Sequence, residues 1–119
     1  MSDITIYHNG ECSKSKGALE ILQEQHIPHQ VRWYLAEPLS IAELSSLLSK
    51  LHMQPSELVR KSEELYKKQF EGKNFSEEEW LIILEQNPVL IQRPIVEKGE
   101  TAIITRPPER IFEILNNQG

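Results

Sequence analysis

The sequence contains a single cysteine, Cys12, among 119 residues, so no disulfide can form within the chain. A lone thiol of this kind is typical of a reducing compartment, and we expect a cytoplasmic protein. No apolar run approaches the roughly 20 residues that a membrane-spanning helix needs, and residues 1–6 lack the basic start and long apolar core of a signal peptide. The formal net charge of −5 argues against bulk nucleic-acid binding, so any anion site must be local.

Sequence patterns for metal and nucleotide sites are weak or missing. The pair His26 and His29 has a proline between its members, which indicates a helix–strand turn, and we interpret both histidines as solvent-exposed polar residues. No glycine-rich phosphate loop is present. We therefore expect no metal and no bound cofactor.

Hydrophobic periodicity predicts a strand, a helix and a second strand in the N-terminal third of the chain. Residues 4–7 alternate as a short strand, and residues 31–35 predict the next one. Between them runs a helix with one apolar face, which Pro28 ends. Such a βαβ unit requires the two strands to be parallel. The predicted helical face consists of Ala18, Leu19, Leu22, Gln25 and His26.

The middle of the chain predicts a helical insertion over about residues 40–88. Ser40 and Ser76 each begin a capping box, with glutamate three residues later, and each precedes an amphipathic helix. Shorter helices are predicted over residues 55–61 and 63–69. The apolar faces of the two longer helices comprise Ile41, Leu44, Leu47, Leu48 and Leu51 in the first, and Trp80, Leu81, Ile83 and Leu84 in the second.

The C-terminal third predicts a hairpin followed by a helix. Strands are expected over residues 94–96 and 102–104, with Gly99 in the turn, and Pro107-Pro108 opens the last helix. The order βαβ, helices, ββα indicates an α/β protein with a thioredoxin-like fold, which is a mixed four-stranded sheet with a helical insertion between its halves. We predict one domain over residues 1–119. The expected face of the last helix is Ile111, Phe112 and Leu115.

Cys12 falls between the first predicted strand and helix, where open α/β sheets usually bind ligands. The unpaired N–H groups and the positive dipole end of a helix N-terminus stabilise a thiolate and attract an oxyanion. Lys14 and Lys16 add positive charge, and Ser13 and Ser15 offer hydroxyl donors. A small buried structural cysteine is the alternative, and the polar neighbours argue against it.

The spacing around Cys12 excludes two common kinds of cysteine site. Position 18 is alanine where the phosphate loop of thiol phosphatases has arginine. Ser15 stands where a dithiol redox pair has its second cysteine. An external thiol must therefore complete any turnover at Cys12.

Arg60, Arg93 and Arg106 are the candidate oxyanion ligands, because a planar guanidinium suits tetrahedral oxyanions better than a lysine point charge does. A surface salt bridge is the alternative for each of them, and it is common. Their functional value depends on convergence near Cys12, which spacing alone does not show. Pro94 stands where thioredoxin-like layouts place a proline that faces the cysteine, and its cis or trans state stays open.

Four motifs then follow one another in the order of a known family. They are ITIYHNGECSKSK, VRWYLAEPLS, ELVRKSEELYK and the pair LIQRPIV and ITRPPERIFEIL. The chain resembles, over nearly its whole length, the glutaredoxin-coupled arsenate reductases of the ArsC type and their Spx-like relatives.

The resemblance implies that Cys12 attacks the arsenic of arsenate and forms a covalent thiol–arsenate adduct. Glutathione, as co-substrate, would then release arsenite, and a glutaredoxin would recycle the mixed disulfide. His8 and Ser15 would help to keep Cys12 as the thiolate. The implied oxyanion-binding residues are Arg60, Arg93 and Arg106, with Lys16 at a position that is frequently arginine in the family, and Pro94 would lie near the site.

Two other functions stay open beside arsenate reduction. One is a non-enzymatic, Spx-like transcriptional regulator that contacts RNA polymerase, although Ser15 removes the cysteine pair of its redox-switching members. The other is a monothiol, glutathione-dependent oxidoreductase that acts on disulfides through Cys12. From the charge and the short apolar runs we expect neither nucleic acid nor a membrane as a partner of this protein.

Overall fold

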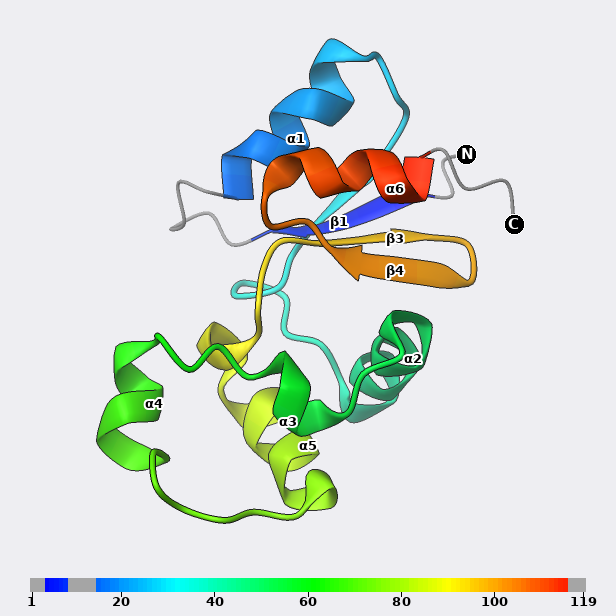
Figure 1. Ribbon diagram of the computed structural model, residues 1–119. Helices are drawn as coiled ribbons and strands as arrows, with labels where there is room; N and C mark the ends of the chain where they lie inside the picture. Colours follow the sequence, from blue (N-terminus) through cyan, green and yellow to red (C-terminus); the bar gives the residue numbers. More distant parts are fainter. Residues whose placement is uncertain (1–3, 9–14, 116–119) are drawn as a thin grey trace. The chain divides into compact units, whose positions relative to one another are not determined.

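The computed structural model describes residues 4–8 and 15–115, apart from the side chains of residues 15 and 16. Contacts divide the chain into two compact units (Figure 1). Residues 1–37 and 93–119 form the first unit, and residues 38–92 form the second. The predicted insertion falls inside the second unit, while the prediction of a single domain stays a prediction.

The first unit contains a mixed four-stranded sheet. Its strands are β1 (Ile4–His8), β2 (Gln30–Trp33), β3 (Ile95–Lys98) and β4 (Thr101–Ile104), in the order β2-β1-β3-β4. β1 is parallel to β2 and antiparallel to β3, and β3 is antiparallel to β4. The predicted βαβ and ββα halves are therefore confirmed, and they meet where β1 pairs with β3.

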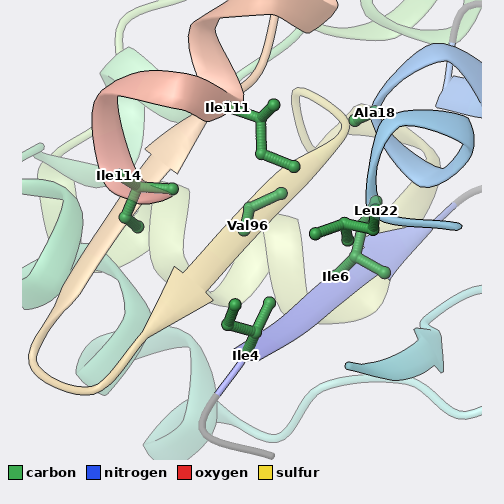
Figure 2. Packing of buried hydrophobic residues seen from close by; sticks show 7 residues of the cluster. All are labelled: Ile4, Ile6, Ala18, Leu22, Val96, Ile111 and Ile114. Carbon is green, nitrogen blue, oxygen red and sulfur yellow. The ribbon is translucent and has the colours of Figure 1, made fainter. Parts of the chain in front are cut away.

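Two helices cover one face of this sheet, α1 (Ser15–Glu24) and α6 (Ile111–Leu115) (Figure 1). Side chains alternate between the faces of a strand, and Ile4, Ile6 and His8 are the buried positions of β1. Full burial of one such aliphatic side chain contributes about 1.5–3 kcal/mol. Figure 2 shows how the core on this face is assembled from Ile4, Ile6, Ala18, Leu22, Val96, Ile111 and Ile114.

The second unit is helical. Its elements are α2 (Ile41–Leu51), α3 (Pro55–Leu58), α4 (Glu64–Gln69), α5 (Glu77–Gln86) and a 3-10 turn, η1 (Pro88–Leu90). Both predicted capping boxes are present, since the Ser40 and Ser76 hydroxyls each accept the N–H of the glutamate three residues on. The buried Trp80 of α5 contacts the rings of Tyr66, Phe70 and Phe75.

Several predicted bounds and faces were wrong. β2 ends at Trp33 instead of continuing to residue 35, because the Trp33 carbonyl accepts the N–H groups of Ala36 and Glu37 in a turn. The helix predicted over residues 55–61 ends at Leu58, and the next residue, Val59, bridges to Ile91.

The last helix presents a different face from the one predicted. It begins at Ile111, after a 3-10 turn η2 (Pro108–Arg110), so that Ile111 and Ile114 are one turn apart and buried. Phe112 is 40% exposed. Ile41 is also exposed, because it begins α2 instead of lying within its buried stripe. Among the described residues, no helix combines the length and the apolar character that crossing a bilayer requires.

We expect Ser76→Ala to lower the free energy of unfolding by about 1 kcal/mol, because it removes a helix cap. The Ser76 Oγ accepts the Glu79 N–H at 3.1 Å, and the Ser76 N–H donates to Glu79 Oε1 at 2.8 Å. Urea denaturation measures the change, and Ser76→Asp, which keeps a side-chain acceptor, is the matched control. Equal losses in the two variants would contradict the role of the cap.

Candidate active site

One edge of the sheet collects the predicted site residues of the first unit. β1 and β2 are parallel, and β4 has the same direction because β3 is antiparallel to both of its neighbours. The carboxyl ends of β1, β2 and β4 and the start of β3 therefore share one edge. His8 ends β1, Arg93 and Pro94 precede β3, and Arg106 follows β4. The structure thus brings the backbone of these residues to one end of the sheet, whereas their convergence on Cys12 stays a prediction.

The N-terminus of α1 belongs to the same edge. A Cβ atom built on Gly17 would lie 2.5 Å from Cγ of Pro108, so the first turn of α1 lies against the segment that follows β4. No acidic residue occupies that first turn. The positive end of the helix dipole is therefore left without a neutralising carboxylate of its own helix, which favours an anion.

His8 is a buried polar residue at the end of an otherwise apolar row. Its side chain is 4% exposed and lies on the face that carries Ile4 and Ile6. The Trp33 ring, opposite His8 in the β1–β2 register, packs edge-on against the imidazole with ring centroids 4.9 Å apart and an interplanar angle of 76°. Trp33 is itself 45% exposed, so it covers His8 on one side and presents an aromatic surface on the other.

Arg93 and Arg106 differ in solvent exposure at this edge of the sheet. Arg93 is 6% exposed, Pro94 is buried and Arg106 is half-buried. Both Arg93-Pro94 and Arg106-Pro107 are cis peptide bonds, which answers the question that the sequence left open for Pro94. The Pro94 carbonyl accepts two hydrogen bonds from Thr105, one from its N–H at 2.9 Å and one from its Oγ1 at 3.2 Å.

Arg60 lies in the second unit, between α3 and α4. Its backbone N–H donates to the Leu90 carbonyl at 2.6 Å, and its Nη1 pairs with Glu63 Oε2 at 3.1 Å. The Arg60 Nε is buried and has no hydrogen-bond partner in the described part of the chain. The guanidinium thus keeps donor capacity beyond its ion pair, and its role toward an oxyanion stays a prediction.

Cys12, the predicted nucleophile, lies outside the described residues. It comes between His8 and the start of α1 in the sequence, and both of these lie at the edge described above. Ser15 and Lys16 are the first two residues of α1, and their side chains are likewise outside the described part. The predicted roles of all three residues therefore stay predictions.

Sequence reasoning missed three residues at this edge. Trp33 gives no sequence signal that links it to His8. Thr105 and Gly17 were not singled out, although a glycine in the first turn of a helix costs stability and signals a close contact. The pairing of Thr105 with Pro94 depends on the register of β3 with β4, which the hairpin prediction implied only in outline.

The two histidines interpreted as polar surface residues lie elsewhere. His26 is exposed and follows α1, and the His29 Nδ1 lies 2.7 Å from the Ile27 carbonyl oxygen, so this histidine bonds to its own turn. Within residues 4–8 and 15–115 there is no group of three or more histidine, cysteine or carboxylate side chains suited to a metal ion.

Comparisons with known proteins identify a family for this chain. Residues 7–114 match the ArsC family. The chain is 40% identical over 114 residues to the uncharacterised protein YfgD of Escherichia coli K12, covering 94% of this chain and 96% of that one. It is 37% identical over 114 residues to a protein named arsenate reductase from Haemophilus influenzae, covering 94% and 98%.

A solved structure shows the same fold. The structure described as an arsenate reductase from Vibrio cholerae superposes with a TM-score of 0.87 at 38% identity, over 93% of this chain and 96% of that one. Its likeness supports the thioredoxin-like α/β arrangement predicted from the sequence. On the family match and on these full-length relatives, the chain belongs to the ArsC family.

Proposed function

We propose that this protein reduces arsenate to arsenite, with Cys12 as the nucleophile. The observation that carries the proposal is the convergence of His8, Arg93 and Arg106 at the sheet edge where α1 begins, on either side of Cys12 in the sequence. Relatives that align over nearly the full chain bear the name arsenate reductase. A thiolate nucleophile and fixed cationic donors for an oxyanion are the two requirements of the reaction.

The chemistry divides into an attack and a reduction. The Cys12 thiolate attacks arsenic, an As–S bond forms, and one arsenate oxygen leaves as water after protonation. Arginine donors offset the charge of the remaining oxygens. A second thiolate then attacks the Cys12 sulfur, a disulfide forms, and the electron pair of the As–S bond passes to arsenic, which leaves as arsenite. Arsenic gains two electrons and the two sulfurs lose two.

The second thiol must come from outside the chain, because Cys12 is its one cysteine. We infer that glutathione supplies it and that a glutaredoxin reduces the resulting mixed disulfide. This cycle requires a reducing environment, which supports a cytoplasmic location. Arg60 and Lys16 are further oxyanion ligands in this proposal, and Ser15 assists the thiolate.

The first test replaces the nucleophile. We expect Cys12→Ser to abolish arsenate-dependent NADPH oxidation in an assay that couples glutathione, glutaredoxin and glutathione reductase, because an alkoxide does not form at neutral pH. The wild-type reaction should also stop when glutaredoxin is left out of the assay, and equally when glutathione is left out. Full arsenate turnover by the Cys12→Ser variant would contradict the proposal. Turnover of a glutathione mixed disulfide without any arsenate would favour the monothiol oxidoreductase instead.

The second test measures oxyanion binding without turnover. Cys12 is the one thiol in the sequence that iodoacetamide can alkylate, so protection of this thiol by added arsenate reports binding near it. We expect Arg106→Lys to raise the half-protecting arsenate concentration roughly tenfold, because lysine keeps the charge but loses the two-pronged hydrogen bonding.

The control for this measurement is Arg110→Lys. Arg110 is an exposed arginine of the same segment whose Nε pairs with Glu113 at 3.2 Å. Arg110→Lys should leave the protection of Cys12 by arsenate unchanged. Equal effects of the two substitutions would show that general surface charge, and not the sheet edge, accounts for binding.

A further inference from the structure

The segment that carries Arg106 is fastened on both of its sides. On one side Thr105 donates its N–H and its Oγ1–H to the Pro94 carbonyl, at 2.9 and 3.2 Å. Thr105 is fully buried, at 0% exposure. A buried hydroxyl is retained only where it has a hydrogen-bond partner, and here that partner is the residue directly after Arg93.

The register of the β3–β4 hairpin shows which residues the Thr105–Pro94 hydrogen bonds bring together. Ile95 pairs with Ile104 and Val96 with Ile103, and the Thr105–Pro94 hydrogen bond carries the same pairing one step further. Arg93 directly precedes Pro94 and Arg106 directly follows Thr105, so each arginine is the next residue beyond this hydrogen-bonded pair. Thr105 thus links the backbone positions from which the two arginine side chains begin.

On the other side, Pro108 is packed against α1. A Cβ at position 17 would lie 2.5 Å from Cγ and 2.9 Å from Cβ of Pro108, which is closer than real contacts allow. Glycine is therefore required for this approach of helix α1 to η2. The contact fixes the distance between the first turn of α1 and the residues that follow Arg106.

We propose that Thr105 and Gly17 are positioning residues, which hold Arg93, Arg106 and the N-terminus of α1 at the spacing of a single tetrahedral oxyanion. The proposal rests on the proposed function, since it concerns the same oxyanion. Thr105 sets the separation of the two arginines through Pro94, and Gly17 sets the separation of Arg106 from the helix end through Pro108. Neither residue touches the anion.

The test for Thr105 uses the iodoacetamide protection of Cys12 by arsenate. Thr105→Val keeps the shape and the backbone N–H but loses the hydroxyl, whereas Thr105→Ser keeps the hydroxyl. We expect the half-protecting arsenate concentration to rise about tenfold in the valine variant, since small misplacements of positioned groups are costly. The serine variant should stay within about twofold of wild type.

A control separates positioning from general loss of stability. Ile114→Val trims the core of the same unit at a buried residue of α6, so it lowers the unfolding midpoint while every residue of the Thr105–Pro108 segment is kept. Its arsenate protection should match wild type. If Ile114→Val weakens protection as much as Thr105→Val does, or if Thr105→Val protects like wild type, the positioning role is overturned.

Gly17 is tested by a double-mutant cycle with Pro108. Gly17→Ala should weaken arsenate protection about tenfold on its own, and less in a Pro108→Gly background, where both clashing atoms are gone. Strictly additive losses would overturn the role of this contact. If arsenate does not protect the wild-type thiol from alkylation, the proposed function fails as well. If arsenate protects the wild-type thiol and the variants equally, only the positioning role of Thr105 and Gly17 is rejected.

Discussion

The antiparallel pairing of β1 with β3 is the interaction on which the candidate site depends. It joins strands from opposite ends of the chain, with Ile6 opposite Val96, and a hydrogen bond from the Tyr7 hydroxyl to Glu97 Oε1 at 2.8 Å spans 90 residues of sequence. Because these strands run in opposite directions, the end of β1 meets the beginning of β3. His8 and Arg93, which the sequence keeps far apart, therefore share one edge.

At the end of β1, this arrangement places a polar residue of the candidate site, His8, at a position that would otherwise add to the apolar core. Ile4 and Ile6 contribute to the core beneath α1 and α6, and the alternation of the strand directs the next inward position, His8, to the same face. An imidazole that is 4% exposed is costly unless it has partners, and the Trp33 ring supplies one contact at the margin of the core. The site begins where the apolar row ends.

Much of the fold was predictable because local signals agree with one another. Capping boxes at Ser40 and Ser76 and the alternation of β1 each reflect physics within a few residues of the chain. The misjudged exposure of Ile41 and Phe112 has another cause. Periodicity shows that a helix has an apolar face, but neighbouring elements decide which turn of that face is covered, and helix starts move by a residue or more.

The candidate site likewise has features that local sequence reveals and features that only tertiary structure reveals. Arginine chemistry and the neighbours of Cys12 are properties of residue type and nearby sequence, so both could be recognised without a structure. The contacts of Thr105 with Pro94 and of Gly17 with Pro108 are tertiary, and each joins residues that only the sheet register and the packing of α1 bring together. The positions of donors are thus less predictable than their identities.

The acidic character of the chain gives these positions particular weight. With a net charge of −5, the protein as a whole does not attract an anion from a distance, and exposed charges act only within a Debye length of about 8 Å at physiological salt. Recognition of an oxyanion must then come from short-range donors in a fixed arrangement. A guanidinium that can drift adds rotamer entropy to the cost of binding, whereas one whose backbone is fastened on both sides loses less freedom when the anion arrives. On the proposal made above, the contacts that fasten the Thr105–Pro108 segment would take the place that long-range attraction has in a basic protein.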